Sequence, residues 1–492
     1  MTFIRPGNWS AIPWAYFMRS PKIFSLLLAA LLSLCYALTI APALSWANGG
    51  ADGGDLITAA FTGGVPHPTG YPLYLLVAHL FQDFPLGGLA FRTNLLSALC
   101  TVLAALLLQS WLIRQLENQK FGVFSAFIGG AAFGLAPLVW GQAVITEVYG
   151  LQSLLILAFL FGLDWTALNG KDWVRGLLLG LAASNHLTSL ILIPLLALDF
   201  SSKALFTLPM VFFKRMAGVL IGLSFYLILP LRALTQPPVN WGNPITLQAF
   251  WWLVSGRLYA SYPFGVSFAD VLLRLRGVAG LLLAQFALLG VVVGIYGLLS
   301  GLPRRILLAS LWLFSSFCLF AVSYASYDSQ VYLIPAFIAF SIWLTYGLSD
   351  GLQALSARFP RLAQLTCALI ILLLLARLPG IFPQVDASHD LRAENFGVGF
   401  VSNAPENALV FAQGDEAVFA LWYFQFSMSQ RSDIVIISEE LIQYDWYLTN
   451  LAHTYPQLMI PFSRPLTASD LLAANPARPA CFVKQSATTF CQ

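Results

Sequence analysis

The chain has 492 residues, of which 58% are hydrophobic and 10% are charged, and its mean hydropathy is +0.76. This apolar content exceeds that of ordinary globular domains and indicates a polytopic membrane protein. The net charge of +3 is small and scattered along the chain, which argues against a nucleic-acid partner.

Apolar runs long enough to cross a bilayer as helices recur as far as about position 381. They are too long and continuous for the strands of a membrane barrel. We therefore predict an α-helical polytopic membrane protein with about eleven spans, at 23–44, 93–113, 121–140, 148–166, 173–184, 187–200, 216–233, 277–300, 306–323, 330–349 and 363–380. The first is interpreted as an uncleaved span because no clear cleavage signal ends it. The short segments on either side of Asn185 and His186 are interpreted as a broken or re-entrant hairpin.

Basic residues divide the loops into two sets, because lysine and arginine favour the cytoplasmic side. Alternate loops carry Arg19, Lys22, Arg114, Lys120, Lys171, Arg175, Lys203, Lys214, Arg215, Arg304, Arg305, Arg358 and Arg361. The opposite loops then carry the polar residues Asp52, Asp55, His67, Arg92, Glu147, Asn185, His186, Arg232, Arg257 and Asp328. We expect an integral protein of a bacterial inner (plasma) membrane with its active site on the extracytoplasmic face.

Two regions outside the spans have recognisable patterns. The loop at about 234–270 contains Phe250-Trp251-Trp252, which is typical of a short amphipathic helix at the membrane surface and suits a lipid-linked substrate. In the polar tail, residues 408–411, 416–426 and 434–437 predict a strand, a helix and a strand. We therefore predict a transmembrane domain at 1–382, with the active site in its first outer loop at about 45–92, and a small extracytoplasmic α/β domain at 383–492.

The six cysteines fall into two groups. Cys35, Cys100, Cys318 and Cys367 lie in apolar runs, where cysteine is usually a small core residue. Cys481 and Cys491 lie in the polar tail, where they either close a short loop in an oxidising compartment or remain free thiols.

The first outer loop contains the most informative pair, Asp52 and Asp55, which are three residues apart among glycines. If a helix begins near Leu56, their simplest roles are a helix cap and a solvated charge. A general base needs a carboxylate that an acceptor hydroxyl can approach closely, and Asp52 fits that role better than Asp55. His67 is held between Pro66 and Pro68, which stiffen the backbone that presents its imidazole.

Other charged residues at span ends suggest binding roles. Arg92, Arg232 and Arg257 are each expected to reach toward lipid headgroups when considered alone. Three guanidiniums on one side of the membrane, however, suit the phosphate of a lipid carrier. The carboxylates of Asp52 and Glu147 could bind a divalent cation, although no metal-ligand spacing is present and we assign no metal. The chain has no Walker loop, dinucleotide glycine fingerprint, Cys-x-x-Cys motif or nucleophile elbow, so soluble nucleotide donors are not implied.

The stretches 52–60, 65–74 and 91–98 resemble the opening of a branch of the GT-C membrane glycosyltransferases that includes the eukaryotic transmembrane protein O-mannosyltransferase. Weaker matches follow at 146–149, 184–188, 229–232, 240–244 and 327–332. Asp55 stands where this family commonly has Glu.

The resemblance implies inverting transfer of a sugar, with mannose as the candidate, from a polyprenyl-phosphate donor to a protein, glycan or lipid acceptor. Asp52 would be the catalytic base, with Asp55 and Glu147 supporting the acceptor or a metal. The predicted donor-phosphate residues are His67, Arg92, Arg232 and Arg257, and the other predicted pocket residues are Tyr71, Asn185, His186 and Asp328. We assign no cofactor, and a divalent cation stays an open alternative.

The sequence leaves two alternative functions open. A transporter or flippase of lipid-linked sugars also places polar residues and broken helices at membrane depth. An assembly scaffold with an inactive site is the third alternative. The one-sided placement of the polar residues and the lack of detectable inverted repeats favour the enzyme.

Overall fold

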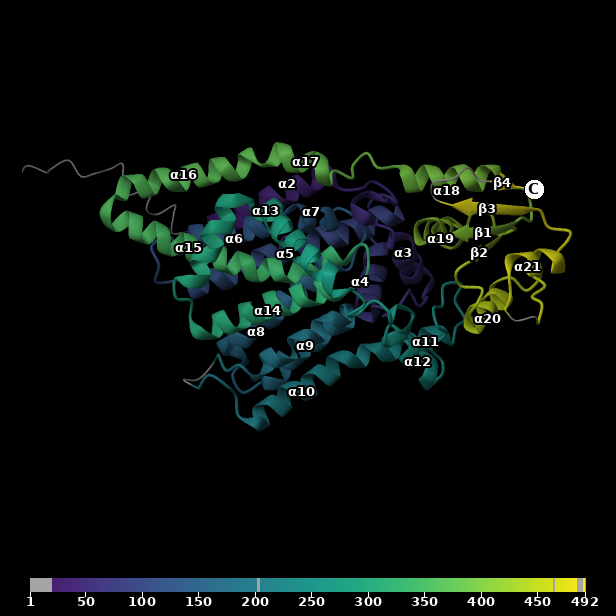
Figure 1. Cartoon of the computed structure of the whole chain (residues 1–492), viewed down its shortest axis with the longest axis horizontal. Helices are drawn as coiled ribbons and strands as arrows, with labels where there is room; N and C mark the ends of the chain where they lie inside the picture. Colours follow the sequence, from purple (N-terminus) through teal and green to yellow (C-terminus); the bar gives the residue numbers. More distant parts are fainter. Residues whose placement is uncertain (1–19, 201–203, 463–464, 485–489, 492) are drawn as a thin grey trace, which may run out of the picture.

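The computed structural model describes residues 20–200, 204–462, 465–484 and 490–491, and its helices form one elongated bundle with a small sheet at one end (Figure 1). Arg19 and Lys203 lie outside the described residues. Among these described residues, seven helical segments are long and apolar enough to cross a membrane: α2 (Pro21–Thr39), α5 (Leu89–Gln115), α10 to α11 (Pro209–Ala233), α13 (Phe268–Leu299), α14 (Arg304–Ser323), η6 to α15 (Ser329–Arg358) and α16 to α17 (Pro360–Val385). An eighth is the pair α6 (Gly122–Gly134) and α7 (Pro137–Ala143), if this pair, bent by 65°, counts as one span.

The prediction of about eleven spans is too high by this measure. The predicted spans 148–166, 173–184 and 187–200 form α8 (Tyr149–Asp164), α9 (Asp172–Asn185) and the 3-10 helix η3 (Leu187–Ala197). These have 16, 14 and 11 residues, fewer than the roughly 20 that a straight crossing needs. The helix does break at the predicted place, because His186 is extended between α9 and η3.

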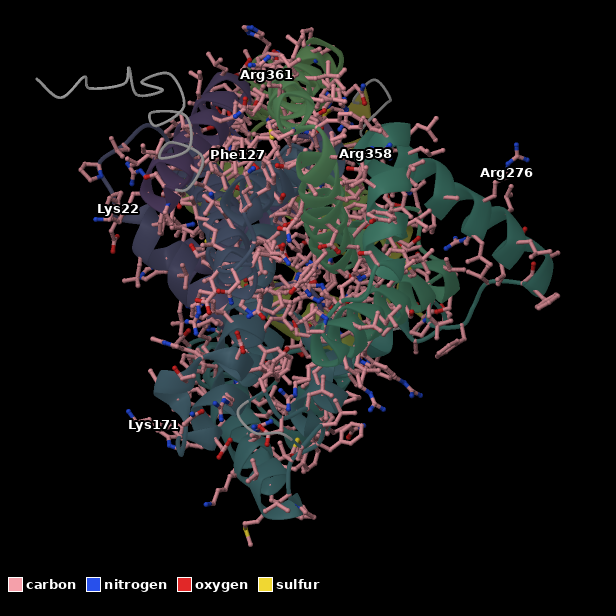
Figure 2. All side chains as sticks on the ribbon, turned by 90° about the vertical axis from the view of Figure 1, so that its left-hand side faces the viewer. Lys22, Phe127, Lys171, Arg276, Arg358 and Arg361 are labelled. Carbon is pink, nitrogen blue, oxygen red and sulfur yellow. A yellow bond between two sulfur atoms is a disulfide. The ribbon has the colours of Figure 1, made fainter. Side chains whose placement is uncertain are left out.

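Helix α15 (Ile334–Arg358) is the core of the bundle, with 94% of its apolar window buried. It packs against α13, α14 and α6. In contrast, only 11% of the apolar window of α16 and α17 is buried, and Figure 1 shows them along one margin. The corner between α15 and α16, near Arg358 and Arg361, lies at the end away from the sheet, and Figure 2 views the molecule from that end.

Shorter helices complete the part of the bundle near the sheet. They are η1 (Ala47–Gly49), α3 (Gly53–Thr62), α4 (Pro72–Gln82), η4 (Ser224–Leu227), α12 (Leu247–Val254) and η5 (Arg257–Tyr259). The short helix η2 (Thr166–Leu168) lies instead in the connection between α8 and α9. The helix α12 lies in the loop where a short helix was predicted, and the Thr246 hydroxyl caps it by accepting a hydrogen bond from the N–H of Ala249.

The C-terminal region, residues 392–491, contains the predicted strand, helix and strand. They are β1 (Leu409–Gln413), α19 (Asp415–Trp422), which continues into the π-helix η7 (Tyr423–Ser427), and β2 (Val435–Ser438). The region also has α18 (Arg392–Asn403), α20 (Asp445–Thr454), α21 (Ala468–Ala474), β3 (Ala480–Lys484) and β4 (Phe490–Cys491), which sequence patterns did not indicate. The predicted domain boundary at 382/383 falls inside α17 (Leu378–Val385) and stays a prediction.

The strands form one sheet in the order β2-β1-β3-β4. Strand β1 is parallel to β2 and β3, while β4 is antiparallel to β3. The last pairing sets Cys481 opposite Cys491, and the two form a disulfide, which resolves the alternative left open by the sequence. Strands β1 and β2 are buried along nearly their whole length, as is usual for parallel strands between covering helices.

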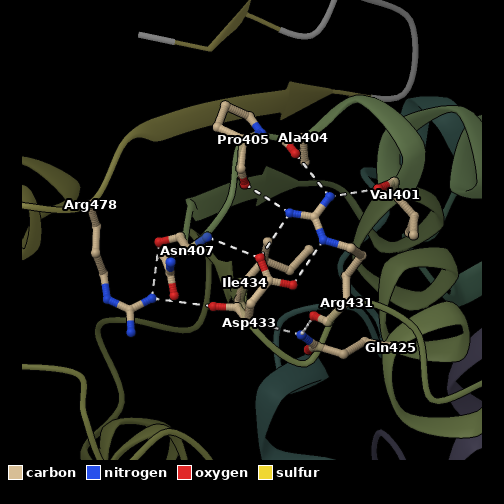
Figure 3. Close-up of polar contacts among 9 residues, drawn as sticks. All are labelled: Val401, Ala404, Pro405, Asn407, Gln425, Arg431, Asp433, Ile434 and Arg478. Carbon is tan, nitrogen blue, oxygen red and sulfur yellow. Dashed lines mark hydrogen bonds and ion pairs between the residues drawn. The ribbon is translucent and has the colours of Figure 1, made fainter.

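A polar cluster ties α18 to the start of β2 (Figure 3). The Arg431 guanidinium donates hydrogen bonds to the carbonyls of Val401, Ala404 and Pro405 and pairs with Asp433. The Asp433 carboxylate in turn accepts a hydrogen bond from the N–H of Asn407. These bonds satisfy carbonyls at the C-terminal end of α18, which would otherwise lack partners.

Candidate active site

A cavity of about 730 Å³ opens between the first outer loop, the segments before α8 and after α9, the loop at 255–263, the turn at 326–332 and the C-terminal region. Of the predicted site residues, it is lined by Asp52, His67, Tyr71, Glu147, His186 and Asp328. The structure thus brings together six predicted residues that span 277 positions of the chain.

Asp55 is completely buried and holds His67 in place. Its Oδ2 accepts hydrogen bonds from the backbone N–H of His67 at 2.9 Å and from the ring Nδ1 of His67 at 2.7 Å. Its Oδ1 accepts a third from the indole Nε1 of Trp241 at 3.1 Å. Asp55 is therefore a positioning residue whose oxygens face protein donors, and it is absent from the cavity wall.

Trp241 reaches Asp55 because its segment pairs with the first loop. The N–H of Val65 donates to the carbonyl of Val239, and the N–H of Trp241 donates to the carbonyl of Val65. The sequence placed Trp241 in a family-like motif but gave no signal that its side chain would bind the first loop. The contact depends on long-range backbone pairing, which local periodicity does not reveal.

Asp52 occupies the N-cap position of α3, but its side chain makes no capping hydrogen bond. The side chain is 37% exposed, and its Oδ2 lies 3.5 Å from His67 Nε2. The same Nε2 is 3.0 Å from the hydroxyl of Tyr71. The carboxylate of Asp52 therefore remains open to the cavity, next to an imidazole that Asp55 orients from the other side.

The charged groups of this site shift one another's pKa values. Burial alone would lower the pKa of His67, but the carboxylates of Asp52 and Asp55 outweigh it and raise the pKa to about 9. Burial raises the pKa of Asp52, with smaller contributions from Asp55 and Asp328, while His67 opposes the shift. At neutral pH the His67 ring is thus an imidazolium beside Asp52, and the raised pKa makes Asp52 a stronger base than an exposed aspartate.

Glu147 and Asp328 contribute carboxylates to other parts of the wall. Glu147 is 5% exposed, and its Oε2 accepts a hydrogen bond from the N–H of Val148 at 3.3 Å. Asp328 is exposed and accepts a hydrogen bond from the hydroxyl of Ser326. Within the described part of the chain, no group of three or more His, Cys, Asp or Glu side chains could hold a metal ion.

His186 and Asn185 have different positions. His186 lines the cavity, and its ring lies 5.7 to 5.9 Å, centroid to centroid, from the rings of Tyr71, Tyr149 and Tyr332. Asn185 is buried beneath the wall, and its Nδ2 donates to the carbonyl of Val148 at 3.2 Å. Asn185 therefore supports the break between helices.

The three predicted phosphate-binding arginines do not converge on the cavity. The guanidinium of Arg92 donates to the carbonyls of Gln82, Leu86 and Gly87. That of Arg232 donates to the carbonyls of Ala59 and Gly64. Arg257 is exposed beside the rim, which includes its neighbour Gly256. Among the residues that the structure describes, the cavity wall has no lysine or arginine side chain.

A different arginine lies next to the cavity. A second hollow of about 410 Å³ lies between α13, α14 and η6 (Ser329–Leu333), and it shares Ser326, Tyr327 and Gln330 with the first. Its wall is mostly apolar and includes Arg274, which donates to the carbonyl of Tyr324 at 2.6 Å and to the hydroxyl of Ser329 at 3.3 Å. The sequence did not point to Arg274, because the predicted span began at residue 277, whereas α13 begins at Phe268.

Two further cavity neighbours come from the C-terminal region. Asp415 lines the cavity, and Phe419 stacks on the ring of His67 with centroids 6.2 Å apart and planes 13° apart. They lie more than 300 positions after the first loop, and nothing in their local pattern distinguishes them from ordinary helix residues.

Comparison with known proteins gives matches in the regions that build this site. Residues 52–206 match the family described as Protein O-mannosyl-transferase TMEM260 N-terminal domain, and residues 393–464 match TMEM260-associated domain 2. The chain is 27% identical over 454 residues to mouse Protein O-mannosyl-transferase TMEM260, covering 84% of this chain and 63% of that protein. It is 22% identical over 487 residues to the Dictyostelium discoideum protein of the same name, covering 87% of this chain and 58% of that protein.

The fold is similar to that of ArnT from Cupriavidus metallidurans. The structure bound to undecaprenyl phosphate superposes with a TM-score of 0.55 at 15% identity, covering 93% of this chain and 92% of that chain. The apo structure gives a TM-score of 0.51 at 15% identity, with the same coverage of both chains. The present chain spans about three fifths of the length of the relatives that it matches in sequence. By sequence the chain resembles the TMEM260 protein O-mannosyl-transferases and by fold it resembles ArnT, which confirms the GT-C resemblance inferred from its motifs.

Proposed function

We propose that the chain is a membrane glycosyltransferase that transfers a sugar, mannose in our assignment, from a polyprenyl-phosphate donor to a hydroxyl of a polypeptide. The observation that carries the proposal is the open carboxylate of Asp52, which faces a 730 Å³ cavity beside the Asp55–His67 pair. The names of the sequence relatives support mannose and a protein acceptor, and the lipid bound to ArnT supports the donor class.

In the proposed reaction, Asp52 accepts the proton of the acceptor hydroxyl while the hydroxyl oxygen attacks the anomeric carbon of the donor. The bond from that carbon to the phosphate oxygen breaks, and polyprenyl phosphate leaves with the bonding electrons. One displacement inverts the anomeric carbon, so no second carboxylate is needed as a nucleophile. Asp55, which is itself bonded by Trp241, fixes the position of His67. The positive charge of His67 therefore stays beside Asp52 in the cavity.

For the donor, we propose that the apolar hollow between α13 and α14 receives the start of the prenyl chain. The phosphate would then lie near Arg274, where the hollow meets the polar cavity. A guanidinium at this junction suits a molecule with an anionic head and an apolar tail, and it would stabilise the charge that grows on the leaving phosphate. This assignment replaces Arg92 and Arg232, whose guanidiniums already bond backbone carbonyls.

We place the reaction on the extracytoplasmic side. The basic residues Arg358 and Arg361 lie at the end of the bundle opposite to the sheet, as the positive-inside rule expects of a cytoplasmic end. The Cys481–Cys491 disulfide, in the region beside the cavity, suits an oxidising compartment. Labelling of single cysteines from either side of intact cells tests this orientation.

The test of function compares purified wild type with Asp52→Asn, using polyprenyl-phosphate mannose and a peptide rich in serine and threonine. We expect the variant to keep its fold and to lose about a hundredfold or more in turnover, the usual range for a general base. Asp83→Asn is the matched control, because Asp83 is an exposed carboxylate at the end of α4 and is absent from the cavity wall.

Undiminished transfer by Asp52→Asn would remove Asp52 from the role of base. Movement of the lipid-linked sugar across vesicles without any transfer would favour the flippase alternative instead.

A further inference from the structure

The C-terminal region forms one wall of the active-site cavity through α19. Asp415 is the first residue of this helix and lines the cavity, and Phe419 stacks on His67 one turn later. Residues four apart on a helix share a face, so the face of α19 that contacts the catalytic group also presents Asp415. The carboxylate thus belongs to the same cavity as Asp52 and is supplied by a separate part of the chain.

The position of α19 is fixed by close packing on α3. A Cβ atom on Gly54 would come within 2.3 Å of the carbonyl oxygen of Phe419, so the missing side chain is what allows the two backbones to approach. Nearby, the hydroxyl of Ser427 donates to that of Thr58 at 3.2 Å. Nδ2 of Asn450 in α20 donates to the carbonyl of Pro238 at 2.8 Å. Asp415 is therefore held at the cavity by the fold.

The Asp415 carboxylate is available for a ligand. Its side chain is exposed to the cavity, and among the described residues no side chain or backbone group is seen to bond it. Enclosure near the cavity and the charge of Asp52 raise the pKa of Asp415 to about 6, so the group is largely ionised at neutral pH. An ionised carboxylate accepts hydrogen bonds and donates none, so its partner must present N–H or O–H groups.

The position of Asp415 favours the acceptor over the donor phosphate. A phosphate is repelled by the neighbouring carboxylates of Asp52 and Asp415, whereas the hollow with Arg274 offers it a cation. A polypeptide presents backbone N–H groups on either side of the hydroxyl that reacts. Figure 1 shows the C-terminal region at the end of the bundle, beyond α3, where a polypeptide would have access.

We propose that Asp415 is an acceptor-binding residue, whose carboxylate accepts hydrogen bonds from backbone N–H groups of the acceptor polypeptide next to the hydroxyl that faces Asp52. The inference rests on the proposed function and adds to it the part of the chain that recognises the acceptor. The plainer role of Asp415 is to stabilise the N-terminus of α19 through the helix dipole. The next residue, Glu416, lies in the same first turn and is absent from the cavity wall, so it separates the two roles.

The test compares Asp415→Asn with Glu416→Gln in the full-length protein. Steady-state transfer is measured with a serine- and threonine-rich peptide and polyprenyl-phosphate mannose, each varied in turn. We expect Asp415→Asn to raise KM for the peptide about tenfold, as expected for loss of a hydrogen bond to a charged group. Its KM for the donor should match wild type. Glu416→Gln should match wild type in both KM values.

A second measurement does not depend on transfer. Binding of the fluorescein-labelled peptide is followed by fluorescence anisotropy without donor, for wild type, Asp415→Asn and Asp415→Glu, after their Tm values have been compared. We expect weaker binding by Asp415→Asn and partial recovery in Asp415→Glu. Equal binding by wild type and Asp415→Asn, or no binding by wild type, would overturn the inference, and so would a change confined to donor KM. Peptide binding that depends on Asp415 in a wild type that transfers no sugar would refute only the proposed function.

Discussion

The carboxylate of Asp55 accepts hydrogen bonds from both the backbone N–H and the ring Nδ1 of His67, twelve residues later in the chain. Two bonds to one residue fix both the loop and the ring, and Trp241 closes the arrangement from a third segment. The pair resembles the way in which a buried carboxylate orients the histidine of a hydrolase triad.

Replacement of Asp55 should therefore damage the site without touching substrate. In Asp55→Asn the neutral amide no longer balances the positive charge of the His67 imidazolium. The substitution also leaves a buried donor without a good partner. We expect a loss of about 1–3 kcal/mol in stability, read as a lower Tm, together with reduced turnover. Asp83→Asn serves as the control in thermal unfolding. A variant with the Tm and turnover of wild type would show that Asp55 does not hold the ring.

The charge on His67 should make the stability of the protein depend on pH. The pKa of His67 is raised from 6.5 to about 9, so its contribution is fully present below pH 6.5 and is lost as the pH rises through about 9. We expect the difference in Tm between wild type and His67→Gln to shrink between pH 6.5 and pH 9.5. A difference that stays constant or grows over this range would contradict the charged imidazole.

Gly54 and Gly53 offer a matched pair that tests the packing of α19 on α3. A Cβ on Gly54 would meet the backbone of Phe419 at 2.3 Å, whereas one on Gly53 would find its nearest atom, in Leu44, at 3.5 Å. We expect Gly54→Ala to lower stability by about 1–3 kcal/mol and to reduce transfer, because α19 must move. Gly53→Ala should be neutral or slightly stabilising, since alanine favours helix. Equal Tm values for the two variants would count against the close approach.

Arg274 and Arg276 form a second pair, two residues apart on α13. Arg274 lines the hollow beside the cavity, while Arg276 is exposed and projects away from the bundle (Figure 2). We expect Arg274→Gln to raise KM for the polyprenyl-phosphate donor about tenfold or more, because a charge-assisted bond to phosphate is lost. Arg276→Gln should keep the donor KM of wild type. The same KM in both variants would place the phosphate elsewhere.

Local patterns in the sequence predicted the features that depend on neighbouring residues. The long apolar runs predicted helices, and the runs at 408–411 and 434–437 predicted β1 and β2. A helix that begins near Leu56 was considered for the first outer loop, and α3 begins there at Gly53, with Asp52 at its N-cap facing the cavity. The span count was too high because apolarity marks buried helices as well as crossing ones, and α8 is both apolar and mostly buried.

The features that depend on tertiary contacts could not be read from the sequence. Arg92 and Arg232 looked like phosphate ligands because they flank apolar segments, yet each satisfies carbonyls of a nearby turn or helix end. Arg274 lay outside the predicted span at 277–300, and the hollow between α13 and α14 is what gives it a role. The place of Asp415 in the cavity could not be predicted, because it depends on the packing of α19 against α3, which lies far away in the chain.

The stacking of Phe419 on His67 has a practical consequence for engineering. A chimera joined between α17 and α18 would replace Asp415 and Phe419 and, with them, the ring contact on His67 in the first outer loop. Such a hybrid would have one wall of its cavity from a different protein. We therefore expect exchange of C-terminal regions between relatives to succeed only when the segment with Gly54 is exchanged together with the segment with Phe419.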